Sequence, residues 1–267
     1  MNAKLYRHVY SESLGCLVVV SDIAHGHGKG GVTRGAATRR FAMRPLSLAV
    51  ALMMGGALHA QTLPTGGTIV GGQGRISTAG TTMTVQQNSA KLAVNWNSFN
   101  IGAGDTVVFN QPSSSAVALN RVLGNNPSQI YGNLRANGQV FLINPSGVLF
   151  GKNAQVSVGG LFASTLPINT SAFMGSSGAY TFADTGGAQG EVVNQGHLKA
   201  VNGGFIVLAG SRVINTGTIS ATSGTVALAA GNSVTLMLDN AGATTVSVDG
   251  ATLGALIRNQ GLIEADG

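Results

Sequence analysis

Two segments of this chain repeat at a spacing of about 21 residues, and this spacing constrains the fold more than any other feature. VNQGHLKA at 193–200 aligns with INTGTISA at 214–221, and FIVLAG at 205–210 aligns with VALAAG at 226–231. A third copy, RNQGLIEA at 258–265, lies about two further repeats along the chain. This period, with short strand-like runs and no helical periodicity, predicts a β-solenoid in which each turn adds strands to parallel sheets.

The repeat also predicts where individual side chains lie. Asn194 and Asn215 should stack at a corner, where Asn tolerates left-handed backbone and its amide can bond the next turn. Gly196 and Gly217 should serve the same turn. The aliphatic residues, Leu208 and Leu228 among them, should point inward. The fold class predicted is therefore all-β, a right-handed parallel β-helix.

Residues 61–267 contain enough chain for about ten turns of this period. The first part of this segment, residues 61–102, does not show the repeat. Because an open solenoid end invites aggregation, we interpret this part as N-terminal capping strands. Trp96 and Phe99 should pack in that cap.

An uninterrupted apolar run at 46–58, LSLAVALMMGGAL, has the length of a signal-peptide core and is short for a membrane span. Arg39, Arg40 and Arg44 supply its positive flank. The small residue Ala60 predicts cleavage between Ala60 and Gln61. Residues 1–60 are thus interpreted as a cleaved, extended signal peptide, and residues 61–267 as the mature domain.

Charge and cysteine content limit what the mature domain can do. The leader contains seven Lys and Arg against two acidic residues, whereas residues 61–267 contain eight against seven. The basic character therefore belongs to the leader, and the rest has no basic patch with interleaved aromatics that would indicate nucleic-acid binding. The single cysteine, Cys16, is also in the leader, so the mature domain can form no disulfide.

Catalytic chemistry is not indicated. The mature domain has one histidine, His197, which is too few for a histidine-rich metal site. Its best interpretation is a solvated surface residue, which argues against a Ser-His-Asp site. A β-helix polysaccharide-active enzyme would need clustered carboxylates beside Lys or Arg. The acidic residues do not fall on matching positions of the aligned repeats. We therefore predict no enzyme, no metal and no cofactor.

Two Asn-Pro motifs lie in the middle of the chain, and both have turn chemistry. Ile143-Asn144-Pro145-Ser146-Gly147-Val148 combines a Pro, whose ring fixes φ at a value that suits a turn, with a Gly that permits positive φ. The other motif is Asn126-Pro127-Ser128-Gln129. From the residues alone, both motifs could simply hold solenoid corners.

These motifs, within LNRVLGNNPSQIYGNLRANGQVFLINPSGVLFGKNAQVSVGGLFAST at 119–165, resemble the haemagglutination-activity or two-partner-secretion domain of the filamentous-haemagglutinin and high-molecular-weight adhesin class. The family patterns are N-P-N-G-I and N-P-N-L; Ser146 and Val148 depart from the first, and Ser128-Gln129 from the second. The leader resembles the family's extended signal peptide through Met1, Asn2, Lys4, Tyr6, Arg7, Val9, VVVS and Gly28-Lys29-Gly30.

This resemblance implies a secretion and targeting domain of a large exported surface protein. Its implied partners are the Sec machinery, signal peptidase and an outer-membrane β-barrel transporter with periplasmic POTRA domains, bound by β-augmentation. The residues Asn126, Pro127, Asn144, Pro145, Ser146 and Gly147 would support recognition by the transporter, directly or by holding the fold. A longer passenger that carries a host-cell or surface receptor site is expected after residue 267. The alternative is a self-standing adhesive module that binds surfaces or glycans.

Overall fold

The computed structural model describes residues 6–11, 16–21, 62–184, 186, 190–238, 244–249 and 255–265. The chain divides into two units, Met1–Met54 and Gly55–Gly267. In the first unit, β1 (Tyr6–Ser11) and β2 (Cys16–Ser21) form an antiparallel pair. The predicted signal core at 46–58 and the predicted cleavage site between Ala60 and Gln61 lie outside the described residues.

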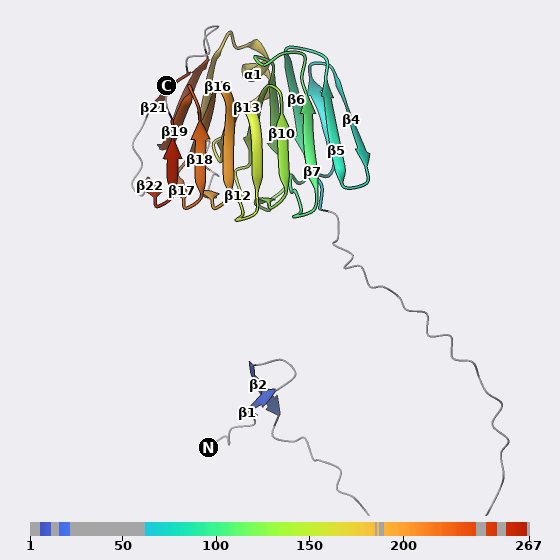
Figure 1. The fold of residues 1–267 in the computed structure, drawn as a ribbon, viewed down its shortest axis with the longest axis vertical. Helices are drawn as coiled ribbons and strands as arrows, with labels where there is room; N and C mark the ends of the chain where they lie inside the picture. The colour runs from blue at the N-terminus through green and yellow to red at the C-terminus, as the bar shows by residue number, and fades with distance from the viewer. Residues whose placement is uncertain are drawn as a thin grey trace, which may run out of the picture. The chain divides into compact units, whose positions relative to one another are not determined.

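The second unit is a parallel β-helix, as the repeat predicted, and each full turn of chain contributes one strand to each of three ladders (Figure 1). The first ladder contains β5 (Thr82–Gln87), β7 (Thr106–Asn110), β10 (Asn133–Ala136), the start of β13 (Gln155–Ser164), the start of β16 (His197–Gly210), β18 (Thr218–Ala221) and β23 (Leu262–Glu264). The second contains β6 (Lys91–Trp96), β8 (Val117–Val122), β11 (Gln139–Ile143), the ends of β13 and β16, and β19 (Thr225–Ala230). The third contains β9 (Ser128–Ile130), β12 (Val148–Phe150), β15 (Val192–Asn194), β17 (Arg212–Asn215) and β22 (Leu256–Asn259).

The N-terminal end of the β-helix is capped by antiparallel strands, which confirms the predicted cap, although only β3 and β4 form it, because β5 and β6 already belong to the first two ladders. β4 (Gly74–Ala79) pairs antiparallel with β5, and β3 (Thr68–Gly71) pairs antiparallel with β6. Trp96 and Phe99 are both buried next to this cap, with ring centroids 5.5 Å apart in an edge-on arrangement. Their packing closes the interior at the first turn.

The register of the turns corrects the predicted repeat in two places. Asn194 lies opposite Asn215 at the expected offset of 21, but in the second ladder Ile206 lies opposite Val226, an offset of 20. Asn259 lies directly opposite Asn215, so the third copy occupies the next turn rather than the second one along. The longest ladder therefore has the seven strands named above, and the estimate of about ten turns was wrong.

Two long segments leave the β-helix between consecutive turns, and they account for the turns that are missing. We call these segments excursions. The first contains α1 (Thr170–Gly175) and β14 (Ala179–Ala183), and the second contains β20 (Ser233–Leu238) and β21 (Thr244–Asp249). They meet each other in an antiparallel sheet of order β14-β20-β21. This outer sheet encloses a second core with the second ladder, in which the rings of Phe162 and Phe182 stack at 4.1 Å. Because neither excursion repeats, the sequence period does not reveal them.

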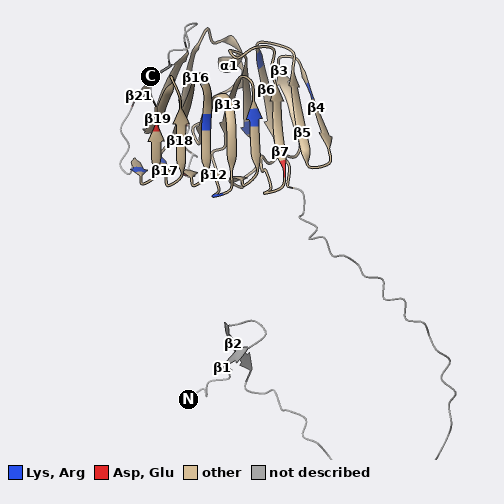
Figure 2. Cartoon of the chain, in the orientation of Figure 1, with Lys and Arg blue, Asp and Glu red and all other residues tan. Residues whose placement is uncertain are grey.

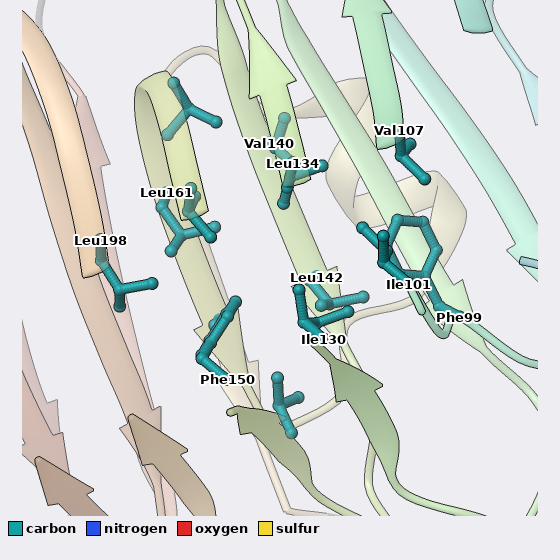
Figure 3. Close-up of a cluster of buried hydrophobic side chains, with 14 of the residues drawn as sticks. Phe99, Ile101, Val107, Ile130, Leu134, Val140, Leu142, Phe150, Leu161 and Leu198 are labelled. Atoms are coloured by element: carbon teal, nitrogen blue, oxygen red, sulfur yellow. The ribbon is translucent and has the colours of Figure 1, made fainter. Parts of the chain in front are cut away.

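The main core fills the space between the three ladders. Strand alternation directs every second side chain inward, as in β5, where buried and partly buried residues alternate. Figure 3 shows Leu134, Leu142, Leu161 and Leu198 pointing into this interior from different strands. The predicted inward residue Leu208 is fully buried, whereas Leu228 is only partly buried.

The predicted asparagine stack is present at the corner that follows the third ladder. The Nδ2 amide of Asn194 donates to Oδ1 of Asn215 at 2.8 Å, and that of Asn215 donates to Oδ1 of Asn259 at 2.8 Å. The expected left-handed backbone is wrong for these asparagines, which end their strands in extended conformation. The following glycines are needed for a different reason, since a Cβ on Gly217 would collide with the carbonyl oxygen of Gly196.

Replacing Leu208 with Asp should lower the free energy of unfolding by about 3 kcal/mol or more, because an unpaired carboxylate would be placed in the dry interior. Leu123→Asp is the matched control, since Leu123 is 61% exposed. We expect it to change stability by less than about 0.5 kcal/mol. Urea denaturation followed by circular dichroism would measure both. Equal effects of the two substitutions would contradict the assigned orientation of β16.

Candidate recognition corner

The β-helix brings the two Asn-Pro motifs together at one corner. The segment at 126–129 leads from β8 into β9, and the segment at 143–148 connects β11 to β12. These elements lie on adjacent turns, because Ile143 pairs with Arg121 and Val148 pairs with Ser128. The two motifs therefore occupy equivalent positions one turn apart, although β10 lies between them in the sequence. We call residues 126–129 and 143–148 the Asn-Pro corner.

Asn144 is the side chain that joins the two turns. It is 0% exposed, and its Nδ2 amide donates to the carbonyl oxygen of Asn126 and to Oγ of Ser128, each at 3.0 Å. Its Oδ1 accepts from the backbone N–H of Ser146 at 3.0 Å. On the other side, its own N–H donates to the carbonyl oxygen of Ser164 at 2.9 Å. Asn144 is thus bonded to the turn before it and to the turn after it.

Pro145 and Gly147 shape the turn around that amide. The N–H of Gly147 donates to the carbonyl oxygen of Asn144 at 2.9 Å, which closes the turn. Gly147 has a φ of +123°, as its turn position predicted, and L side chains rarely adopt this conformation. Its carbonyl oxygen accepts from the N–H of Ser128 at 3.0 Å. The carbonyl oxygen of Pro145 accepts from Gly190 of the following turn at 3.1 Å.

Different residues form the exposed surface and the buried interior of the Asn-Pro corner. Asn126 and Pro127 are exposed, and Pro145 and Ser146 are half-buried. Leu123, at 61% exposed, flanks them and has a side chain of a kind that normally prefers the interior. The motif therefore divides into buried residues that hold the turn, Asn144 and Gly147, and residues that a partner can reach. Burial alone separates these two roles, and the sequence motif does not.

Two cations of the second ladder have roles that the sequence analysis missed. The Nζ of Lys91 donates to the carbonyl oxygens of Phe173 at 3.1 Å, Met174 at 3.3 Å and Ser176 at the C-terminal end of α1. The same ammonium lies 5.4 Å from the ring centroid of Tyr180. Burial lowers the pKa of Lys91 from its ordinary value. Lys91 thus fixes the first excursion to β6.

Arg121 makes a parallel connection from β8. Its Nη1 donates to the carbonyl oxygen of Ile168 at 3.1 Å, while Nε and Nη2 donate to Oδ1 of Asn95. Burial lowers the pKa of this guanidinium as well. A signal for both cations existed in the sequence, since each is the one charge in an otherwise neutral strand, KLAVNW or VALNRV.

The ionisable groups of the described residues are dispersed. Asp105 accepts from the N–H of Thr62 at 2.7 Å, and Glu191 pairs with Arg212 at 2.7 Å. His197 is exposed, as predicted. Within the described part of the chain, three or more His, Cys, Asp or Glu residues nowhere gather in a group that could hold a metal ion. The described residues also include no helix that is long and apolar enough to span a membrane.

Comparison with known proteins gives two family matches that together cover most of the chain. A family model described as the TPS secretion domain matches residues 60–267, and one described as the extended signal peptide of the type V secretion system matches residues 1–51. The chain belongs to the TPS secretion-domain family. It is an exported protein that passes through the periplasm to the surface or exterior of a Gram-negative bacterium. The family and the fold are those of a secretion domain rather than of an enzyme.

The relatives agree with this assignment. A heme/hemopexin-binding protein of Haemophilus influenzae is 36% identical over 233 residues, which are 84% of this chain and 25% of that protein. A second protein of the same description is 51% identical over 83 residues, 31% of this chain and 9% of its own length. The crystal structure of the HMW1 secretion domain from H. influenzae is similar with a TM-score of 0.69 and 30% identity over 76% of this chain and 57% of that one. The chain thus spans about a quarter of the first relative.

Asn144→Ala should lower the free energy of unfolding by about 2–4 kcal/mol, because three buried side-chain hydrogen bonds are lost. Whole-domain stability is about 5–15 kcal/mol, so the variant should remain folded. Asn126→Ala is the matched control, since only the backbone oxygen of Asn126 takes part in the link to Asn144. Its free energy of unfolding, measured by urea denaturation, should be within about 0.5 kcal/mol of that of the unsubstituted protein. A large loss for Asn126→Ala would show that this separation of roles is incorrect.

Proposed function

We propose that this TPS secretion domain works by presenting the Asn-Pro corner to an outer-membrane β-barrel transporter with periplasmic POTRA domains. The Sec machinery and signal peptidase act first, and the mature domain is then recognised in the periplasm. The observation that carries this proposal is the joining of both family motifs into one surface through the buried amide of Asn144. In this scheme Asn144 and Gly147 position the corner, and Asn126, Pro127 and Ser146 contact the transporter.

Binding by β-augmentation is the second part of the proposal. At the N-terminal end of the β-helix, the sheet ends at β3 and β4, whose outer edges pair with no other described strand. Such an edge offers unpaired N–H and C=O groups to an added strand. A POTRA strand that pairs there would hold the domain by its backbone, while the Asn-Pro corner would supply specificity through side chains.

The passenger is proposed to be a large adhesin-like or haemagglutinin-like protein, because the chain spans only about a quarter of the heme/hemopexin-binding relative. A host-cell or surface receptor would be bound by that remainder. We propose no catalytic activity for the domain itself. An adhesive module that acts without a transporter is the second candidate, and it is favoured by two exposed cations on the first ladder, Arg135 of β10 and Lys199 of β16.

Export should separate the two roles within the Asn-Pro corner. In a host that expresses the transporter, Asn126→Ala combined with Pro127→Ala should reduce secretion about tenfold or more, because the contact surface is lost while the turn is kept. Asn144→Ala should be held in the periplasm and degraded. Surface and periplasmic amounts would be compared by immunoblotting, with and without the transporter gene.

The control for this experiment is Asn153→Ala, which changes an exposed turn asparagine outside the corner and should be exported normally. Normal export of the folded Asn126 and Pro127 variant would mean that the corner only holds a turn. Secretion of the unsubstituted protein without the transporter would overturn the targeting role and favour the adhesive module.

The leader should be removed during export. Mass spectrometry of the exported protein should find Gln61 at the N-terminus, because Ala60 supplies the small residue that signal peptidase requires. An Ala60→Leu variant should be processed more slowly or at another bond. An exported protein that retains residues 1–45 would refute the assigned signal peptide.

A further inference from the structure

The outer face of the first ladder presents polar side chains in straight rows. Residues two apart on a strand share a face, and in-register parallel strands place equivalent residues side by side. One row crosses β10, β13, β16 and β18 as Arg135, Ser157, Lys199 and Ser220, each opposite the next. A neighbouring row crosses the same strands as Asn133, Gln155, His197 and Thr218.

These rows line an open hollow of 840 Å³. Arg135, His197 and Lys199 are exposed on it, and none of them takes part in an ion pair among the described residues. Glu264 on β23 lies opposite Ser220 of β18, and it is the one acidic side chain that continues these rows among the described residues. Figure 2 shows that Lys and Arg, and few acidic residues, interrupt the otherwise uncharged strands of this sheet. The hollow therefore has a positive floor with neutral hydrogen-bonding groups around it.

The spacing of the cations is fixed by the β-helix. Neighbouring strands lie about 4.8 Å apart, so Arg135 and Lys199, two strands apart, are held at about 10 Å with the Ser157 hydroxyl between them. His197 lies two residues before Lys199 on the same strand, at a distance of about 7 Å along β16. A ligand that bridges Arg135 and Lys199 must carry anionic groups about 10 Å apart on an extended backbone that crosses the strands.

From this arrangement we propose that the outer face of the first ladder binds an acidic polysaccharide. The chain would lie across the strands, with sulfate or carboxylate groups at Arg135 and Lys199 and its hydroxyls at Asn133, Ser157 and Thr218. Single-stranded nucleic acid would need aromatic side chains for base stacking. Phe109, the one Phe, Tyr or Trp that lines the hollow, is buried at 1% exposed. This site is separate from the Asn-Pro corner and does not depend on recognition by a transporter.

The test uses the mature domain, residues 61–267, which contains all three ladders and both cores, and measures its binding to immobilised dextran sulfate. Arg135→Gln combined with Lys199→Gln should weaken binding about tenfold. The matched control is Arg75→Gln combined with Lys152→Gln, which removes the same charge from exposed positions on β4 and the β12–β13 turn. This control should bind like the unsubstituted domain, and uncharged dextran should not bind. Circular dichroism would verify that both variants are folded.

The outcomes decide the proposal in both directions. A selective loss for the Arg135 and Lys199 variant, with binding that falls as salt is added, supports the site. Equal losses of binding in both double variants would show that binding depends only on net charge, and this result would overturn the proposal. An absence of binding to dextran sulfate would overturn it as well. Tighter binding of oligo(dT) through the same two residues would overturn it in favour of nucleic acid. Because none of these measurements involves export, failure here leaves the secretion function untouched.

Discussion

The structure depends on backbone hydrogen bonding between successive turns. In a parallel β-helix, the N–H and C=O groups of each strand find their partners on the turns before and after it, so no turn is satisfied by itself. This requirement fixes the register within each ladder and explains why glycines follow the stacked asparagines, where a Cβ on Gly217 would collide with the turn below. It also explains the antiparallel β3 and β4, which give the first turn its partners. The cores and the functional surfaces are built on this spacing.

The residues that recur from turn to turn could be predicted from the sequence, because their environment recurs as well. Asn194 and Asn215 were placed correctly since an amide can bond to an identical amide one turn away. The outer sheet could not be predicted, because β14, β20 and β21 lie in excursions that do not repeat and pair only within that sheet. For the same reason Asn259 was assigned to the wrong turn. The division of the Asn-Pro corner into buried Asn144 and exposed Asn126 also depends on which turn covers which, and this is a tertiary property.

The functional surfaces use the turn spacing in two ways. At the Asn-Pro corner, equivalent connections on adjacent turns lie side by side, so two short motifs become one surface whose shape depends on a single buried amide. On the first ladder, the same spacing lines up Arg135, Ser157 and Lys199 in a row across the strands. One scaffold can therefore carry a recognition surface at a corner and a separate polar surface on a flat face. Lys91 and Arg121 serve neither surface, since they hold the excursion that covers the aromatic core.

The pairing of β14 with β20 imposes an order in time. Thr181 and Thr235 hydrogen-bond to each other although they are far apart in the sequence. In a chain that emerges from its N-terminal side, β14 emerges before β20. Until β20 follows, β14 has no strand beside it and Phe182 is not covered. The turns that include β16 to β19 can form during this interval, because each can pair with the turn that has already formed before it. Closure of the aromatic core therefore depends on contacts between segments far apart in the sequence, whereas growth of the β-helix depends on contacts between successive turns, and long-range contacts are the slower kind to form.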